Sequence, residues 1–389
     1  MPAIARIQSF ASDLTRIRRD IHAHPELGFE ERRTADLVAE RLASFGIAVD
    51  RGLAGTGVVG TLTCGASPRS VGLRADLDAL PLQERNGFAH RSRHEGKMHA
   101  CGHDGHTTML LGAARYLAET RNFDGTVHFI FQPAEEAMGG AERMVKEGLF
   151  ARFPCESVFG MHNVPGMRAG TFAVRRGPTM AGGAVFEIAV QGVGGHGALP
   201  HAAIDPVLVA SHIAVALQSI VARNVSPLDS AVISVTQIEG GHAFNVIPES
   251  ARMRGTARAF QDRTMEMLER NMRRIAENVA AGFGASATLD FRAMFRPLVN
   301  DVREAQFAAD VAAALVGEEN VNREGLMIMA SEDFPEMLRD RPGAFINIGN
   351  GEGEGSCEVH NPGYDFNDAI LPVGASLWAR LVEAKLPAR

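Results

Sequence analysis

The chain has few cysteines, no surplus of positive charge and no long uninterrupted apolar run. Its four cysteines among 389 residues lack paired spacing, which indicates a reducing compartment and argues against a disulfide scaffold. The net charge is -7, with acids and bases interspersed, so we expect no nucleic-acid partner. No 18-residue apolar run occurs, because even residues 207–221 are interrupted by Ser211, His212 and Gln218, so we expect no membrane partner.

The remaining composition is that of an ordinary soluble protein. Hydrophobic residues make up 46% of the chain and charged residues 22%, which argues against a disordered or fibrous protein. Residues 1–20 have the pattern of a charged amphipathic helix and lack the apolar core of a signal peptide. We therefore expect a cytoplasmic protein with two or three domains.

Helical and strand-like segments alternate through the first 180 residues. Helical periodicity covers residues 7–23, 34–45 and 106–120, and short apolar runs typical of buried strands cover 58–63, 71–75, 126–132 and 157–161. This alternation predicts an α/β catalytic domain with a mostly parallel sheet and helices on both faces.

A different order of elements begins near residue 184. Strands are expected at 184–191, 230–239, 250–260 and 286–294, and helices at 206–223 and 264–283. This β-α-β-β-α-β order is the split βαβ, ferredoxin-like α+β unit. The first pattern then resumes, with helices at 301–316 and 368–385 and a strand at 344–348. We predict a catalytic domain of residues 1–183 and 296–389, interrupted by an inserted domain of residues 184–295.

Potential ligands and acids follow several predicted strands, where sites form in open α/β sheets. The densest group is HACGHDGH, residues 99–106, which precedes a predicted helix. Cys101 and His103 flank one glycine, so both side chains can face the same side of the backbone. Thiolate and imidazole are preferred ligands of zinc-like ions. The simpler alternative is a solvated loop in which Asp104 caps the helix.

The pair Glu135-Glu136 follows the apolar run 126–132. Two neighbouring buried carboxylates repel each other unless a cation lies between them. Because adjacent side chains point in different directions, Glu136 can bind a metal while Glu135 acts as general base on a water. The alternative is a surface acid pair before a helix near Gly140.

Two further histidines, His162 and His360, also follow predicted strands. Each alone is as readily an ordinary polar residue. Together with the residues above they make five candidate ligands, which suits two ions about 3.5–4 Å apart that share a ligand and a bridging water. The candidate ligands are Cys101, His103, Glu136, His162 and His360.

Two aspartates precede the ligand-rich segment. We expect Asp78 to accept a ring N–H from a ligating histidine and so fix its orientation. The role of Asp76 stays open, with an ion pair to Arg74 as the alternative.

The inserted domain carries GGHGALPH at residues 194–201. Glycines beside a histidine suggest close approach of the backbone to a ligand. A loop of a second domain can close over a site and supply a donor to an oxyanion, a role we expect for His196. His201, Asn245 and Arg258 are candidates for binding the substrate carbonyl and carboxylate. The alternative is that the loop is an ordinary β-turn and that Arg258 is an arginine on the face of a strand, without a role in binding.

The motifs RADLDALP (74–81), HACGHDGHT (99–107), QPAEE (132–136), GMHN (160–163), GGHGALPH (194–201) and HNPGYDF (360–366) resemble the aminoacylase/carboxypeptidase superfamily of two-metal peptidases. The chain is most similar to the branch of hippurate hydrolases, bacterial N-acyl-amino-acid amidohydrolases and plant auxin-conjugate hydrolases. The resemblance covers nearly the whole chain and includes the inserted domain.

This resemblance implies that the five candidate ligands bind metal and that Glu135 is the general base. It also implies that the inserted domain is a lid and dimerisation domain whose His196 reaches the partner subunit's site. Other branches have a metal-binding histidine at the position of Asp76, so here Cys101 is the more plausible ligand. Dipeptidase and carboxypeptidase branches usually carry an Asp-Asp pair where this chain has His103-Asp104, which places those activities second.

The residues and the resemblance together predict metal-dependent hydrolysis of N-acyl amino acids to a carboxylate and a free amino acid. The cofactor would be two divalent ions of zinc, manganese, cobalt or nickel. One alternative is an acyl transferase with Cys101 as nucleophile and His103 or His106 as base. Another is a metal-dependent binding protein without catalysis. An open edge strand and the apolar helix at 206–223 predict a homodimer through the inserted domain.

Overall fold

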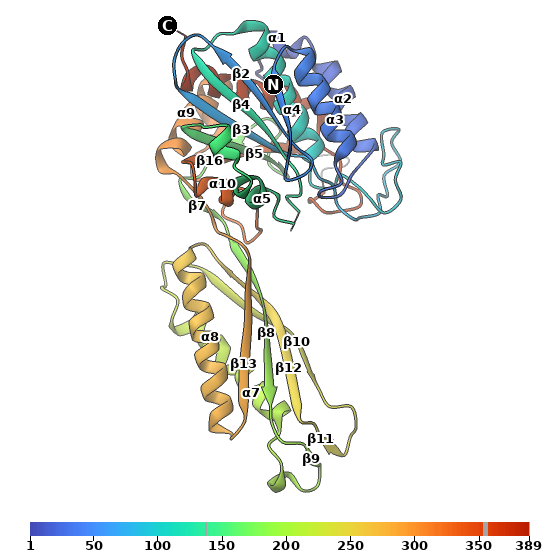
Figure 1. The fold of residues 1–389 in the computed structure, drawn as a ribbon, viewed down its shortest axis with the longest axis vertical. Helices are drawn as coiled ribbons and strands as arrows, with labels where there is room; N and C mark the ends of the chain where they lie inside the picture. The colour runs from blue at the N-terminus through green and yellow to red at the C-terminus, as the bar shows by residue number, and fades with distance from the viewer. Residues whose placement is uncertain (137, 353–356, 389) are drawn as a thin grey trace. The chain divides into compact units, whose positions relative to one another are not determined.

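The computed structural model describes residues 1–136, 138–352 and 357–388 (Figure 1). The chain divides into two compact units. The first contains Met1–Gly177, Asn300–Leu326 and Asp333–Arg389, and the second contains Pro178–Val299 and Met327–Glu332. The assignment of catalysis to one unit, and of closure or dimerisation to the other, stays a prediction.

The first unit is built on an eight-stranded sheet with the order β1-β2-β4-β3-β5-β16-β6-β15. Its central strands β4, β3, β5 and β16 run parallel, whereas β1 and β2 pair antiparallel on one side. The strands are β1 (Ala48–Leu53), β2 (Gly57–Cys64), β3 (Ser70–Asp76), β4 (Gly125–Gln132), β5 (Ser157–Pro165), β6 (Phe172–Ala173), β15 (Val321–Asn322) and β16 (Gly343–Gly351). All of β3 is buried, as a central strand of a sheet covered on both faces must be.

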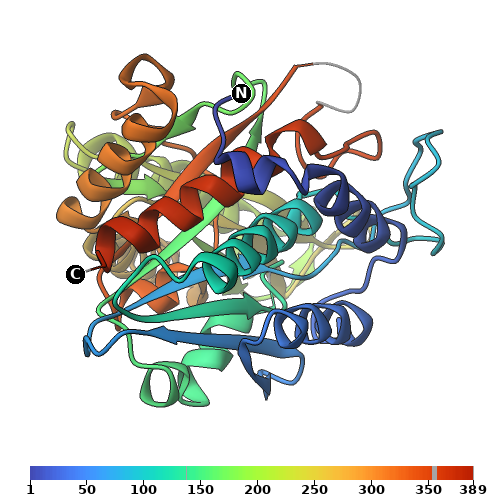
Figure 2. The same cartoon turned by 90° about the horizontal axis from the view of Figure 1, so that it is seen from above.

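Helices cover both faces of this sheet. The larger layer contains α1 (Ala5–Gln8), α2 (Ala11–Ala23), α3 (Arg32–Ser44), α4 (His103–Thr120), α9 (Val302–Val316) and α11 (Leu371–Lys385). Figure 2 shows the red helix α11 running beside the teal helix α4, and these two pack directly on each other. The opposite face carries α5 (Gly140–Lys146), α6 (Leu149–Arg152) and α10 (Pro335–Leu338), with Phe334 of that layer against Phe345 of β16.

The second unit is a four-stranded antiparallel sheet with two helices on one face (Figure 1). Its elements follow the order β8 (Gly182–Gln191), α7 (Pro206–Arg223), β10 (Ala231–Gly240), β12 (Ser250–Ala259), α8 (Asp262–Gly282) and β13 (Ser286–Phe295). Strands β9 (Gly195–His196) and β11 (Val246–Ile247) form a small separate ribbon. Alternate residues of β8 and β12 point into the core, as expected for a sheet covered on one face.

Helix α7 is long and apolar enough, by length and composition alone, to cross a membrane. In the described chain it is the one helix with this property. Its residues Val209, Ile213, Leu217 and Ile220 are nevertheless buried in the core of the second unit. This packing is that of an amphipathic helix on a sheet.

The predicted fold class is confirmed, although several boundaries differ. The helix expected at 7–23 is divided into α1 and α2 at Ser9 and Phe10. Helix α4 begins at His103, three residues earlier than predicted, because Gly102 takes the left-handed conformation (φ +100°) directly before it. Strand β1 lies outside the predicted strands, since Asp50, Arg51 and Gly52 interrupt its apolar residues and only Leu53 is buried.

Candidate metal centre

Cys101 and His103 lie on a tight turn at the start of α4. Gly102 between them has a φ of +100°, which a side chain rarely tolerates. A Cβ atom there would lie 2.0 Å from Oδ1 of Asn163 and 2.7 Å from the Tyr364 hydroxyl. The glycine therefore lets the turn approach β5 closely, with Cys101 and His103 both buried.

The buried His103 and the partly buried His162 are both oriented by main-chain carbonyls. Nδ1 of His103 lies 2.9 Å from the carbonyl oxygen of Asp78, and Nδ1 of His162 lies 2.7 Å from that of Asn163. When each Nδ1 donates, Nε2 is left as the free ligand atom. Nε2 of His162 lies 3.3 Å from Sγ of Cys101. Orientation of His103 thus comes first from the Asp78 backbone, with the Asp78 carboxylate at 3.3 Å.

The two glutamates follow β4 at the edge where its parallel neighbours also end. The Glu136 backbone N–H donates to Oδ2 of Asp78 at 2.9 Å, and Oε1 of Glu136 lies 3.2 Å from Nε2 of His360. Oε2 of Glu135 lies 4.0 Å from Nε2 of His103. Glu135 is 7% exposed, so the alternative of a solvated surface pair does not describe it.

The structure brings all five candidate ligands together in overlapping groups. Within each group the potential ligand atoms lie within 4.8 Å of one another. Cys101 belongs to one group with His103 and His162, and to another with Glu136 and His360. Glu135 forms a third group with His103 and Glu136. Cys101 is therefore shared by the group that contains His162 and the group that contains His360.

Unpartnered buried atoms show that these residues fit a cation. Among the described residues, Nε2 of His103 is buried without a hydrogen-bond partner, and Oε1 of Glu136 and Oδ1 of Asp78 have only ion-pair contacts with histidine nitrogens, at 3.2 Å and 3.3 Å. Such atoms are costly unless something satisfies them. Thiolate, imidazole and carboxylate together form the donor set of a zinc-like ion.

The electrostatics of the cluster point to the same conclusion. Burial lowers the pKa of His103, but the Asp76 and Asp78 carboxylates outweigh it and hold this pKa well above the ordinary value. Burial lowers the pKa of His162 to about 3, so this imidazole stays neutral, as a ligand must. The surplus of negative charge around His103 favours a cation, and a bound divalent ion displaces the His103 proton.

Asp76 takes part in a buried network behind the ligands. Its carboxylate accepts from Nη1 of Arg74 at 2.7 Å and lies 2.7 Å from Nδ1 of His106. Burial raises the pKa of Asp76, but His103, His106 and Arg74 lower it far more. His106 in turn lies 2.7 Å from Oδ1 of Asn163. Asp76 thus forms an ion pair with Arg74, as predicted from the sequence for the case in which Asp76 has no catalytic role.

The remaining predicted site residues belong to the second unit. His196 is exposed on β9, where its backbone pairs with Val246 of β11, and its Nδ1 accepts from the backbone N–H of Ala198 at 3.1 Å. His201 lies exposed in a short 3₁₀ turn, and Asn245 is exposed beside the ribbon. Arg258 of β12 donates to the Ser331 hydroxyl. Their roles stay predictions.

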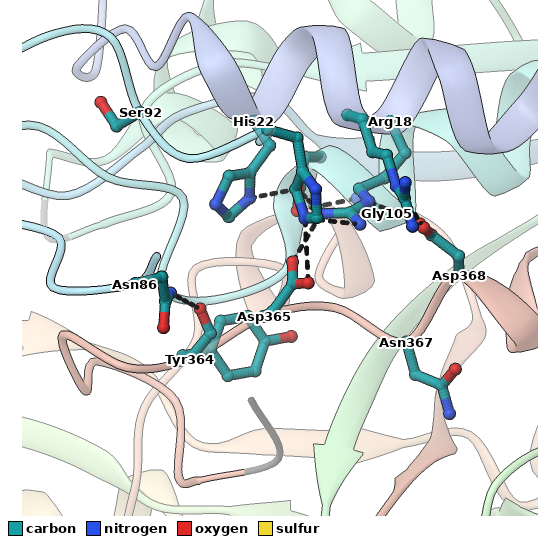
Figure 3. Close-up of polar contacts among 12 residues, drawn as sticks. Arg18, His22, Asn86, Ser92, Gly105, Tyr364, Asp365, Asn367 and Asp368 are labelled. Atoms are coloured by element: carbon teal, nitrogen blue, oxygen red, sulfur yellow. Dashed lines mark hydrogen bonds and ion pairs between the residues drawn. The ribbon is translucent and has the colours of Figure 1, made fainter. Parts of the chain in front are cut away.

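A buried arginine holds the segment that follows His360 (Figure 3). Arg18 of α2 is fully buried and donates to Asp365 at 2.6 Å and to Asp368 at 2.7 Å. The backbone N–H of His360 donates to the carbonyl of Ala100 at 2.7 Å. These contacts fasten the His360 segment to α2 and to the residue before Cys101.

His22, also drawn in Figure 3, lies between two acids. Its Nδ1 is 2.8 Å from Oδ2 of Asp104 and its Nε2 is 3.3 Å from Oε1 of Glu84. Burial lowers the pKa of His22, but Asp104 and Glu84 outweigh it and raise the pKa to about 9. A charged His22 therefore fixes the position of the Asp104 carboxylate, and Asp104 is the residue after His103.

Four residues around the centre have no signal in the sequence motifs: Glu31, Asn163, Arg18 and His22. Asn163 belongs to the GMHN motif, whose spacing gave a signal only for His162. Glu31 stands in the charged run EERR, which is typical of a solvated helix start, yet it is fully buried. No local pattern distinguishes such residues, because their partners are distant in sequence.

The family model described as peptidase family M20/M25/M40 matches residues 72–384. The hippurate hydrolase of Campylobacter jejuni is 42% identical over 381 residues, which cover 98% of each chain. IAA-amino acid hydrolase ILR1-like 4 of Arabidopsis thaliana is 41% identical and covers 97% of this chain and 87% of its own. A crystal structure from Bacillus subtilis, described as a dinuclear metal-binding peptidase, is 34% identical with a TM-score of 0.86 and covers 97% of this chain and 99% of its own.

Proposed function

Because the chain belongs to peptidase family M20/M25/M40, we propose that it hydrolyses the amide bond of N-acyl amino acids with two divalent ions held by its five clustered ligands. The relatives named hippurate hydrolase and IAA-amino acid hydrolase support this substrate class. The observation that carries the proposal is that Cys101 belongs to two ligand groups, within each of which the potential ligand atoms lie within 4.8 Å of one another. Glu135 lies equally close to His103 and Glu136.

In the proposed two-metal centre, Cys101 would be a ligand of both ions, and the other four ligands would be divided between them. His103 and His162 would complete one site, and Glu136 and His360 the other. When bound, the ions would supply Lewis-acid polarisation of the substrate carbonyl and lower the pKa of a water. We propose zinc, manganese, cobalt or nickel, since thiolate and imidazole accept these ions.

Glu135 is the proposed general base. Its carboxylate takes a proton from the attacking water as the water oxygen bonds to the amide carbon, and then delivers that proton to the nitrogen. The C–N bond breaks, and the products are a carboxylate and the free amino acid. Support comes from the position of Oε2, 4.0 Å from Nε2 of His103. Asp78 serves this step by accepting the Glu136 backbone N–H at 2.9 Å, which fixes the residue after the base.

The second unit supplies the proposed substrate contacts. His196 would donate to the developing oxyanion, and Asn245, Arg258 and His201 would bind the substrate carbonyl and carboxylate. We further propose a homodimer through this unit. Strand β10 is an edge of its sheet, and Leu208 and Val215 of α7 are 49% and 75% exposed.

The acyl-transferase alternative is disfavoured by the environment of Cys101. Burial raises the pKa of this thiol well above its ordinary value, and the Glu136 carboxylate raises it further. A nucleophilic cysteine needs the opposite, a pKa lowered by positive charge or by a nearby base. A thiol in this environment becomes a thiolate when a metal ion binds it.

A substrate panel tests the proposed function. The metal-loaded protein is assayed on N-acetyl and N-benzoyl amino acids, and on unblocked dipeptides, with release of the free amino acid as the readout. We expect turnover of the N-acyl compounds and little of the dipeptides. Turnover of dipeptides alone would replace the proposal with a dipeptidase or carboxypeptidase, and activity that survives complete metal removal would favour the cysteine mechanism. We propose a cytoplasmic location, which fractionation tests.

A further inference from the structure

The turn that leads into Glu135 has an unusual backbone. Ala134 has a φ of +54° and is fully buried. A non-glycine residue in the left-handed region persists only where its surroundings hold it there. Whatever holds Ala134 therefore also sets the direction in which the next side chain, Glu135, leaves the backbone.

Two carboxylates hold the backbone on either side of Glu135. Oε1 of Glu31 accepts the N–H of Ala134 at 2.9 Å, and Oδ2 of Asp78 accepts the N–H of Glu136 at 2.9 Å. The carbonyl of Ala134 accepts the N–H of Gly140 at 3.0 Å. Three hydrogen bonds thus fix the backbone of this turn on both sides of Glu135.

Glu31 is costly to keep in this position. Its side chain is fully buried, and burial raises its pKa to about 7, although the Thr56 hydroxyl and backbone N–H groups act against this shift. Oε2 accepts the Thr56 hydroxyl at 2.6 Å, and this bond leaves Oε1 aimed at Ala134. An apolar side chain of similar size would fill the space without the cost of desolvating a carboxylate.

The segment before Glu31 also lies directly against this turn. A Cβ atom on Gly28 would lie 2.7 Å from Sδ of Met138 and 3.0 Å from Cβ of Ala134. The segment from Gly28 to Glu31 therefore packs against the turn at Ala134, and the Glu31 carboxylate hydrogen-bonds to that turn.

We propose that Glu31 is a positioning residue for Glu135, which fixes the strained turn at Ala134 so that the Glu135 carboxylate faces the ligand cluster. The inference rests on the proposed function, since it presupposes Glu135 as the base. Glu31 acts through the backbone of Ala134, and its side-chain hydrogen bonds go to the Thr56 hydroxyl and to the Ala134 N–H.

The test uses Glu31→Met in the full-length, metal-loaded protein. Methionine fills the buried space but accepts no hydrogen bond of this kind. We expect kcat to fall about 10²-fold, as for a misplaced catalytic group, with KM and metal content unchanged. Glu31→Gln keeps an acceptor for the Ala134 N–H and should lose less than about tenfold.

Glu26→Met is the matched control. Glu26 lies on the same segment, but its carboxylate accepts from Arg33 and Thr34 at the start of α3. This variant should lower the melting temperature and leave kcat within about threefold of wild type. A merely structural role of Glu31 predicts similar kinetics for the two methionine variants, and that result would overturn the proposal.

A double-mutant cycle with Glu135→Gln separates the proposal from the function on which it rests. If Glu31 acts through Glu135, adding Glu31→Met to Glu135→Gln lowers the residual turnover no further. An equal loss in both backgrounds overturns the positioning role. An inactive Glu135→Gln with a fully active Glu31→Met also overturns it and leaves the base in place, whereas a fully active Glu135→Gln removes the base and the positioning role together.

Discussion

Sγ of Cys101 lies 3.3 Å from Nε2 of His162, with Nδ1 of that histidine turned to the backbone carbonyl of Asn163. The two ligand atoms thus face each other from the turn before α4 and from β5, although Cys101 and His162 are 61 positions apart in the sequence. Cys101 also belongs to the group with Glu136 and His360, so its thiol is close to the potential ligands of both proposed metal ions.

The first prediction is that Cys101→Ala loses bound metal together with activity. The variant removes the one residue shared by both ligand groups, and thiolates bind zinc-like ions strongly. Metal content by mass spectrometry, measured beside turnover, checks this. Full metal occupancy with no activity would instead favour Cys101 as a nucleophile.

The second prediction is that Glu135→Gln keeps the fold and most of the metal but loses turnover by about 10²–10⁴-fold, as for a lost general base. Glutamine has nearly the same size and leaves Glu136 in place. Turnover, metal content and thermal unfolding of the same preparation distinguish a lost base from a lost ligand. Turnover near the wild-type value would exclude Glu135 from the mechanism.

The third prediction concerns pH and His22. Its pKa of about 9 in the folded protein lies above the ordinary value of 6.5. The charged imidazole therefore stabilises the fold fully below about pH 6.5, and this contribution is lost as the pH rises through about 9. A shift of this size corresponds to roughly 3 kcal/mol of free energy of unfolding.

Urea unfolding of wild type and His22→Gln, both saturated with metal, measures this contribution. The wild type should be more stable than the variant at pH 6, and the difference should shrink steadily between about pH 7 and 10. A difference that stays constant over this range would show that the charge on His22 contributes nothing.

The fourth prediction tests the proposed dimer. If His196 serves the partner subunit's site, a mixture of inactive His196→Ala and inactive Glu135→Gln chains should recover part of the activity. A mixed dimer keeps one site with Glu135 from one chain and His196 from the other. No recovery after confirmed subunit exchange would mean that His196 acts within its own chain or not at all.

The parts of the structure that could be predicted from the sequence are those set by local pattern. Strand β4 is mostly apolar and almost entirely buried, as expected for a central strand of a sheet that is covered on both faces. Glu135 and Glu136 follow the strand after only Pro133 and Ala134, so the position of the strand predicts their place at the edge of the sheet. The turn at Gly102 could also be expected, because a glycine between two ligands permits a tight backbone.

The residues that could not be predicted depend on distant partners. Glu31 hydrogen-bonds to Ala134, which lies 103 positions further along the chain, and His22 bonds to Asp104, 82 positions away. Nothing near Glu31 or His22 in the sequence shows that the charge is buried. Asp104 was considered as a helix cap, but α4 begins at His103 and Asp104 lies fully buried in its first turn.

The most direct test of the account is a metal titration of the metal-free protein. Chelated and dialysed protein is titrated with zinc or manganese, and bound metal per chain and hydrolysis of an N-acyl amino acid are measured in the same samples. The account predicts no turnover without metal and full turnover as occupancy approaches two ions per chain, about the number that a paired-metal site requires. Full turnover in the metal-free protein would contradict it.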